Sequence, residues 1–329
     1  MKTKDYYSSY HYKYGGAEIS FVSRYSLNKN DISDYRLTIP IFGDFIYSTR
    51  YSYLIFVLFS PLLGYKRYST KADLLFANGL DGIALVNTLY KKNINSKTIY
   101  IHVRSEIELF KISPLCNDNF IKQLLKFLAQ KVLDLNSSIY KKRLTWIARN
   151  SKIIVLYNSP YTKHIGNETY RSFEYKIETP YSLGNINYRP QKITGGIKKI
   201  FCVGWSQNKG KQIIYELSLI FKDITFVVVG VNKKISKPES NNILFLGFIS
   251  DWIHLVSCSD LILVPSLVPE TFSRVTAEAM YNDKAVLASK IGNIELLLKE
   301  HPSCLVNNPC DISEWTKKIL DLNADSLHN

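Results

Sequence analysis

The chain has 329 residues, 46% of them apolar, and a formal net charge of +14. This length accommodates two ordinary hydrophobic cores, so we expect two domains. The polar start MKTKDYYSSY argues against a secretory leader, and the longest apolar run, residues 53–63, is too short for a membrane-spanning helix and contains Pro61. We therefore expect a cytoplasmic protein.

The positive charge is concentrated in one half of the chain. Residues 1–190 contain 27 Lys and Arg against 14 Asp and Glu, whereas residues 191–329 contain 15 against 14. A basic first half suggests an anionic partner, and we favour peripheral contact with an anionic membrane. Nucleic acid is not expected, because no recognised binding module is present and the aromatic residues are not interleaved with basic ones.

The cysteines and histidines show no metal-site spacing. The five cysteines form no CxxC pair, and the six histidines form no HExxH motif. We expect buried free thiols in a reducing compartment and no zinc site.

The first half reads as alternating strands and helices. Its start, residues 3–12, is a weak strand pattern: either the first strand is short and Tyr-rich, or the chain lacks part of that edge of the sheet. Later strands and helices are predicted by apolar runs bounded by turn residues, with Pro160 in the first turn of one helix. The predicted strands lie within 72–82, 97–103 and 151–159, and the predicted helices begin at 83, 120 and 158.

The helix predicted over residues 120–135 is amphipathic. One face carries Ile121, Leu124, Leu125, Leu128, Val132 and Leu135, and three lysines (Lys122, Lys126, Lys131) lie toward the other. Most such helices pack on their own domain. The alternative is that this helix rests on an anionic bilayer.

The second half shows the same alternation more clearly, which predicts a doubly wound α/β domain. We place the linker in residues 182–196 and the domains at 1–190 and 191–329, giving two Rossmann-like domains that face each other across a cleft. The last helix is expected to pack back on the first domain. The predicted strands of this half are 197–204, 224–230, 241–249, 260–265, 284–289 and 304–306, and the predicted helices are 209–221, 251–259, 273–281, 293–300 and 311–322.

One strand-turn-helix segment carries two carboxylates eight positions apart. In VPSLVPETFSRVTAEAM, Glu270 precedes the helix and Glu278 lies inside it. The segment, followed by AVLASKIG, resembles the E-x7-E donor-binding signature of the retaining GT-B glycosyltransferases of family 4. The helix that begins near Ser273 can offer free backbone N–H groups to a diphosphate. A carboxylate beside phosphate is repelled by it but can accept hydrogen bonds from hydroxyl groups.

The resemblance assigns roles to this segment. It implies that Glu270 contacts the sugar of a nucleoside diphosphate-sugar and that Glu278 contacts the ribose. The intervening donor-binding positions are Thr271, Phe272, Ser273 and Arg274.

A lysine-bearing loop follows the first strand of the second half. VGWSQNKGK is similar to the family's loop whose lysine contacts the diphosphate, and Lys209 matches that position. Trp205 and Ser206 stand where the family often has an arginine. Lys211 or Arg274 would therefore have to supply the missing positive charge for the leaving diphosphate. A P-loop is excluded by the glycine spacing and by Gln212 in place of Ser or Thr.

The first half supplies weaker candidates. Gly15 and Gly16 resemble the family's glycine loop, where the backbone can approach the donor. His102, at the end of a strand, matches a histidine that faces the donor sugar in the family. Three further residues are candidates for the acceptor side: Asn78, Asp81 and Arg104.

The chain contains no DxD triplet, so no metal ion or other cofactor is expected to meet the diphosphate charge. By resemblance, His102, Lys209 and Glu270 would be the catalytic residues of a retaining glycosyltransferase. Its acceptor would be a glycan or a lipid-linked acceptor at the inner face of the cell membrane, in bacterial surface polysaccharide or lipopolysaccharide biosynthesis. The alternative is a non-catalytic nucleotide-sugar-binding protein of the same fold.

Overall fold

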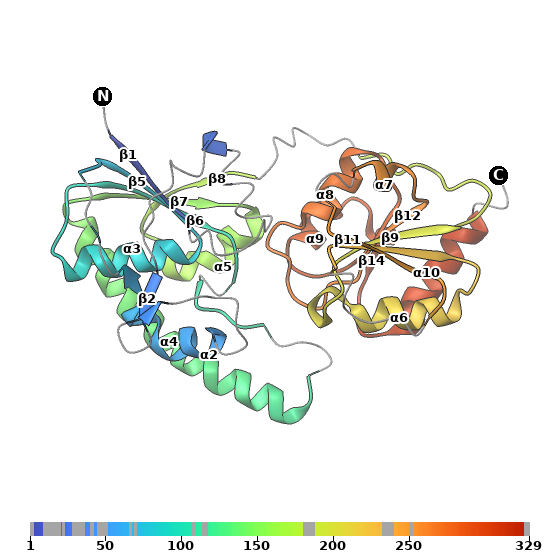
Figure 1. Cartoon of the computed structure of the whole chain (residues 1–329), viewed down its shortest axis with the longest axis horizontal. Coiled ribbons are helices and arrows are strands. Elements are labelled where there is room, and N and C mark those ends of the chain that lie inside the picture. The colour runs from blue at the N-terminus through green and yellow to red at the C-terminus, as the bar shows by residue number, and fades with distance from the viewer. Residues whose placement is uncertain are drawn as a thin grey trace. The chain divides into compact units, whose positions relative to one another are not determined.

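The chain forms two compact units, each of which is an α/β domain of the Rossmann-like type (Figure 1). Unit 1 comprises residues 1–113 and 119–180, and unit 2 comprises residues 114–118 and 181–329. The computed structural model describes residues 3–8, 21, 24–27, 37–39, 43–44, 52–65, 68, 71–106, 109–113, 118–179, 188–231, 240–249 and 253–325.

Unit 1 is built on a five-stranded parallel sheet. The weak first strand is short and Tyr-rich, and it pairs in parallel with the next strand of the sheet. The sheet order is β1 (Lys4–Tyr7), β5 (Leu74–Asn78), β6 (Thr98–Val103), β7 (Lys152–Tyr157) and β8 (Glu174–Ile177), and the connecting helices are α3 (Leu80–Lys91), α4 (Phe120–Ala148) and α5 (Pro160–Tyr170).

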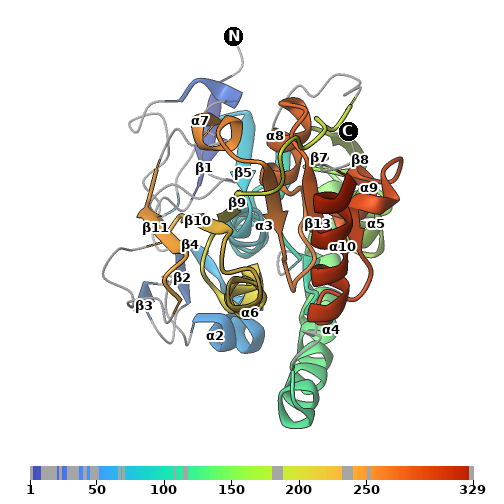
Figure 2. The same cartoon turned by 90° about the vertical axis from the view of Figure 1, so that its right-hand side faces the viewer.

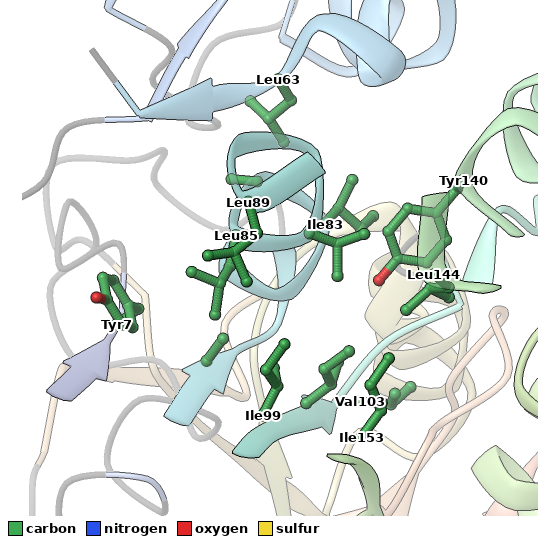
Figure 3. Close-up of a cluster of buried hydrophobic side chains, with 14 of the residues drawn as sticks. Tyr7, Leu63, Ile83, Leu85, Leu89, Ile99, Val103, Tyr140, Leu144 and Ile153 are labelled. Atoms are coloured by element: carbon green, nitrogen blue, oxygen red, sulfur yellow. The ribbon is translucent and has the colours of Figure 1, made fainter. Parts of the chain in front are cut away.

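The core of unit 1 lies on one face of this sheet. Because the strands follow one another in chain order, right-handed crossovers place α3, α4 and α5 on the same face. Figure 3 shows side chains of α3 above those of β6 and β7, with two side chains of α4 beside them. The labelled residues of these elements are Ile83, Leu85, Leu89, Ile99, Val103, Tyr140, Leu144 and Ile153.

The opposite face of the unit 1 sheet is aromatic. The Tyr6 and Phe76 rings stack 5.0 Å apart and the Phe76 and Tyr100 rings 4.5 Å apart, because these residues are register partners on neighbouring strands. His102 lies on the same face, two residues after Tyr100 on β6, and Phe21 and Tyr25 pack edge-on against its ring. The aromatic face therefore leads to one of the predicted site residues.

The apolar run 53–63 forms a helix that packs within unit 1. It becomes α2 (Ser52–Phe59) and a 3-10 turn (Ser60–Leu62), and Asn136 of α4 donates a hydrogen bond to the Val57 carbonyl at 2.6 Å. No helix among the described residues is long and apolar enough to cross a membrane. A small antiparallel sheet joins β2 (Leu37–Ile39) to β3 (Gly43–Asp44) and β4 (Gly64–Tyr65).

Unit 2 has a six-stranded parallel sheet in the order β11-β10-β9-β12-β13-β14, whose direction of growth reverses between β9 and β12. Every strand and helix predicted for this half is present, with bounds that differ by a few residues. The strands are β9 (Lys199–Val203), β10 (Thr225–Val229), β11 (Ile243–Gly247), β12 (Leu261–Val264), β13 (Val286–Ser289) and β14 (Leu305–Val306), and the helices are α6 (Lys211–Ile220), α7 (Ile253–Ser257), α8 (Arg274–Tyr281), α9 (Asn293–Leu297) and α10 (Ile312–Asp325).

Two separate cores flank this second sheet, so unit 2 is doubly wound as predicted. One core packs α6 and α10 on one face, with Trp315 and Ile319 of α10 fully buried. The other packs α7, α8 and α9 on the opposite face, as Figure 1 shows. The last helix thus packs on α6 of its own unit.

The cysteines differ in state. Cys202 is buried, Cys304 is half-buried and Cys258 is exposed, and all three are free thiols. Cys310 is disulfide-bonded, so the expectation of free thiols is wrong at this position. Cys116 lies outside the described residues.

Candidate functional site

The candidate site of unit 2 lies where the strand order reverses. β9 and β12 are parallel neighbours, so the loops that follow them leave the same edge of the sheet. In open parallel sheets this edge, beside the reversal, is where ligands bind. The Leu267 amide donates a hydrogen bond to the Asn208 carbonyl at 2.9 Å, which ties the two loops together.

Two glycines allow this close approach. Gly210 has φ +71°, and a Cβ there would lie 2.1 Å from the Pro265 carbonyl oxygen, so no other residue fits without moving the backbone. Gly204 has φ +87°, and a Cβ there would lie 3.0 Å from Cγ of Lys209. The Lys209 side chain therefore lies directly over Gly204.

Lys209 and Glu270 meet in the space between these loops. Lys209 Nζ lies 2.5 Å from Glu270 Oε1, and the Ser266 hydroxyl donates to the same oxygen at 2.6 Å. The side chain of Lys209 is 39% exposed and that of Glu270 is 16% exposed. The structure thus brings together a solvent-accessible cation and an oriented carboxylate that the sequence predicted as site residues.

A third loop, between β13 and α9, holds the backbone of Glu270. Gly292 has φ +59°, and a Cβ there would lie 2.7 Å from both the backbone nitrogen and the carbonyl oxygen of Glu270. The Asn293 amide donates to the Glu270 carbonyl at 2.8 Å, and the Asn293 side chain donates to the Phe272 carbonyl at 2.9 Å. Sequence reasoning assigned no role to Gly292, Asn293 or Ser266. The available signal was that Ser266 and Gly292 belong to the stretches VPSLVPETFSRVTAEAM and AVLASKIG that carry the family resemblance.

The helix α8 follows Glu270 after a short turn. Its N-cap, Ser273, has φ +62° and makes no side-chain hydrogen bond to the backbone of the first turn, because its hydroxyl bonds to Thr276 Oγ1 at 2.9 Å. The first N–H groups of α8 are therefore not capped by Ser273. Thr271 and the buried Phe272 form the turn between Glu270 and the helix.

Glu278 is paired with Arg274 one turn earlier on α8. Arg274 Nη2 lies 2.9 Å from Glu278 Oε1, and the glutamate side chain is only 12% exposed. Arg274 is thereby oriented along the flank of α8, and it keeps Glu278 in place.

Lys211 has a different environment from Lys209. Its ammonium group lies 5.6 Å from the centre of the Trp205 ring, and Trp205 packs edge-on against Phe245. Of the three cations predicted for this site, only Lys209 is placed against Glu270.

A hydrogen-bonded network forms a second candidate site, in unit 1. Arg104 Nη2 lies 3.0 Å from His102 Nδ1, and Arg104 Nε donates to Asn78 Oδ1 at 3.3 Å. Asn78 in turn donates to Ser8 Oγ at 3.2 Å, and His102 Nε2 lies 2.8 Å from the Tyr25 hydroxyl. The network joins residues at the carboxyl ends of β1, β5 and β6, and it includes three of the predicted residues.

The protonation state of His102 follows from these partners. A guanidinium group can only donate, so Nδ1 of His102 accepts from Arg104, and the ring proton sits on Nε2 and is donated to Tyr25. Burial and the positive charges of Arg104 and Arg24 hold the pKa of His102 well below its ordinary value. His102 is 1% exposed and neutral.

Asp81 belongs to a different group of contacts. It is buried in the first turn of α3 and accepts a hydrogen bond from the Tyr65 hydroxyl at 2.8 Å. Burial, together with the adjacent Asp81 carboxylate, raises the pKa of Tyr65 well above its ordinary value. Gly15 and Gly16 lie outside the described residues.

Within the described ranges, no three acidic, histidine or cysteine side chains form a group that could hold a metal ion. Lys209 and the amino end of α8 offer positive charge to a bound anion.

Comparison with known proteins gives a family match for unit 2. Residues 197–325 match the family model described as "Glycosyl transferases group 1". None of the curated proteins matches the sequence.

Solved structures show the fold of the whole chain. Anabaena Alr3699/HepE in complex with UDP-glucose aligns with a TM-score of 0.60 and 16% identity over 99% of this chain and 93% of that chain. A mutant of S. aureus TarM in complex with Fondaparinux, alpha-GlcNAc-glycerol and UDP aligns with a TM-score of 0.50 and 15% identity over 77% of this chain and 49% of that chain. The protein therefore has the two-domain Rossmann-like fold of GT-B glycosyltransferases, with the group 1 glycosyl transferase pattern in its second unit.

Proposed function

We propose that this protein is a retaining glycosyltransferase that moves a sugar from a nucleoside diphosphate-sugar to a glycan or lipid-linked acceptor. The observation that carries the proposal is the pairing of Lys209 with Glu270 beside the start of α8. This cation, carboxylate and helix terminus lie at the strand-order reversal of a domain that matches group 1 glycosyl transferases.

In this site the charges of the donor's diphosphate would meet positive groups, and the hydroxyl groups of its sugars would meet carboxylates. Lys209 and the N–H groups of α8 would bind the diphosphate, because both are positive and hydrogen-bond donors. Glu270, turned into the site by Ser266, would accept hydrogen bonds from the sugar hydroxyls, and Glu278 would accept from the ribose diol. This arrangement would meet the charge of the leaving diphosphate without a metal ion.

Retention of configuration follows from attack on the face that the diphosphate leaves. The acceptor oxygen would bond to the anomeric carbon while the bond from that carbon to the diphosphate oxygen breaks, and the departing phosphate would take the acceptor proton. This part of the proposal is supported by the resemblance to the E-x7-E signature.

The residues of unit 1 would serve the acceptor side and the donor sugar. His102 is held neutral, so it would act there as a hydrogen-bonding group and not as a general acid. Arg104 and Asn78 are oriented by the same network. Asp81, which is bonded to Tyr65, is the weakest of these candidates.

The acceptor and its location are proposed from charge. The excess of basic residues in the first half favours an anionic, membrane-side acceptor, as in surface polysaccharide or lipopolysaccharide biosynthesis at the inner face of a bacterial membrane. The two fold neighbours are described with UDP-glucose and with UDP and alpha-GlcNAc-glycerol, so UDP-sugars are the first donors to test.

The test is a thermal-shift screen with UDP-, GDP-, ADP- and CMP-sugars. A donor that binds the folded state raises the melting temperature by mass action, and one nucleotide series should do so selectively. The same donor should be consumed slowly by hydrolysis, and Glu270→Ala should abolish that turnover, whereas Glu300→Gln, at an exposed carboxylate outside the site, should not. A protein that shows no response to any of the four series would contradict the proposal.

The alternative is a nucleotide-sugar-binding protein without transfer activity. It is favoured by Trp205, which stands where the family often has an arginine and which engages Lys211. A donor that stabilises the protein but is neither hydrolysed nor transferred would support this alternative.

A further inference from the structure

The helix α4 is apolar on two opposite sides. Its inward side buries Leu133, Tyr140, Leu144 and Ile147 in the core of unit 1. At 100° per residue, Leu124, Leu128 and Leu135 point the opposite way. The first half of the helix exposes seven large apolar side chains, each between 47% and 79% accessible, which we call the α4 apolar face: Phe120, Ile121, Leu124, Leu125, Phe127, Leu128 and Leu135.

The α4 apolar face ends within the helix. Farther along the same side, exposed Ser138, Lys142 and Thr145 take its place. Figures 1 and 2 both show the first half of α4 extending beyond the other labelled elements of unit 1. The neighbouring helix α2, which packs against α4, exposes Leu54 and Leu58. A domain surrounded by water gains nothing from such a contiguous apolar surface, and surfaces of this kind mark interaction sites.

The basic charge on the side of this face comes from two lysines. At 100° per residue, Lys131 points to the same side as the face, and its ammonium lies 5.3 Å from the centre of the Phe127 ring. Lys142 follows on the same side and is exposed. Lys122 and Lys126 point to the opposite side, where Lys126 donates to the Ser113 carbonyl at 3.3 Å. The first acid of α4, Asp134, lies at the edge of the face. A partner that covers this face must therefore supply apolar surface together with negative charge.

A second copy of the chain meets this requirement poorly. In a two-fold dimer the same patch faces itself, and the acid that α4 carries nearest to it, Asp134, lies at its edge, so a second copy offers Lys131 and Lys142 little negative charge. An anionic bilayer supplies both components, because its phosphates lie at the level that lysine side chains can reach while leucine and phenylalanine side chains enter the acyl region.

We propose that the α4 apolar face is an interfacial membrane-docking surface that lies flat on an anionic lipid bilayer. This proposal rests on the proposed function, because the surface would serve to bring the enzyme to a lipid-linked acceptor. Its evidence is independent of the donor site, so either proposal can fail alone.

Vesicle sedimentation tests it with the full chain. The protein should pellet with phosphatidylcholine vesicles that contain phosphatidylglycerol, bind less at high salt, and bind much less to phosphatidylcholine alone. Leu124→Glu/Leu128→Glu should weaken binding by at least about tenfold, because two inserted apolar side chains become charged. The matched control, Ser138→Glu/Thr145→Glu, adds the same charge to the same side of the helix outside the face and should keep most of the binding.

The outcomes separate the alternatives. Wild-type protein that stays in the supernatant with anionic vesicles would overturn the proposal, as would a Leu124→Glu/Leu128→Glu variant that binds as the wild type does. A wild-type dimer that this variant makes monomeric, with no vesicle binding by either, would assign the face to a second copy. Circular dichroism and melting temperature verify that the variants fold. Donor-induced thermal shifts, measured on the same samples, report on the donor site separately.

Discussion

Lys209 and Glu270 form an ion pair 2.5 Å long across 61 positions of the chain. Their loops follow adjacent strands, β9 and β12, and are fixed by the Leu267 to Asn208 hydrogen bond. In the proposed complex a diphosphate would replace the carboxylate as the partner of Lys209. Donor binding would therefore exchange one ion pair for another and free Glu270 to accept hydrogen bonds from the sugar.

The two nearby lysines of this loop should differ in their effect on activity. Lys209→Gln should lower kcat/KM for the donor by about 10²- to 10³-fold, the usual loss when one group that stabilises developing charge is removed. Lys211→Gln should have a smaller effect, because Lys211 lies over Trp205. The measurement is steady-state turnover with the donor found by thermal shift, with Lys222→Gln, at an exposed position in the same unit, as the unaffected control. Equal losses for Lys209→Gln and Lys211→Gln would contradict the assignment.

Sequence patterns predicted unit 2 well because its strands are continuous apolar runs. The run at 225–229, Thr-Phe-Val-Val-Val, is short and rich in β-branched residues, which is typical of a strand buried on both sides, and the helices between such runs have clear apolar faces. The strand β8 was missed because the alternation of polar and apolar residues in Glu-Tyr-Lys-Ile covers only four residues, all of them exposed. The helix α4 runs to Ala148, well past the predicted end at 135, because no Gly or Pro interrupts residues 120–148.

The residues of the candidate site could be predicted where a local motif carries them. Glu270, Ser273 and Glu278 lie in a single strand-turn-helix segment, so their spacing was visible in the sequence. The contact of Gly292 with Glu270 depends on two loops that meet in space, and no local pattern reports that meeting.

The loop at Gly292 should be essential for the position of Glu270. Gly292→Ala adds a methyl group 2.7 Å from the Glu270 backbone at a left-handed φ, whereas Gly195→Ala adds one at a similar φ with no atom within 4 Å. The control should lose about 1 kcal/mol of unfolding free energy from backbone strain alone. Gly292→Ala should lose about 1 to 3 kcal/mol more from overpacking.

Chemical denaturation of the two variants measures this difference, and donor binding gives a second readout. Because the clash is with the backbone of Glu270, Gly292→Ala should also weaken the donor-induced thermal shift, while Gly195→Ala should leave it intact. Indistinguishable variants would show that the β13 to α9 loop moves aside without cost and does not hold the carboxylate.

Chelation of divalent ions should not lower activity. Lys209 and the amino end of α8 can meet the diphosphate charge, and no cluster of metal ligands occurs within the described ranges. The measurement is turnover in EDTA against turnover with added Mg²⁺. Strict dependence on a divalent ion would contradict the proposed mode of diphosphate binding.

Acid should destabilise the protein through His102. In the folded state its pKa lies well below the ordinary value near 6.5, because burial and the charges of Arg104 and Arg24 oppose protonation. The unfolded chain therefore binds a proton at this position at a higher pH than the folded chain does. The stability that His102 contributes by remaining neutral is fully present above about pH 6.5 and is lost as the pH falls below that value, by at most roughly 1.4 kcal/mol per pH unit.

The contribution of this residue can be isolated by comparing slopes. Between pH 6.5 and 5 (roughly the range over which an unfolded histidine gains its proton), the free energy of unfolding of wild type should fall more steeply than that of His102→Gln. Glutamine can still accept from Arg104 and donate to Tyr25 but does not titrate. The other histidines titrate in both proteins, so their effects cancel in the difference. Equal slopes would mean that His102 gains a proton as easily in the folded protein as in the unfolded chain. In that case the Arg104 guanidinium could not be donating to its Nδ1.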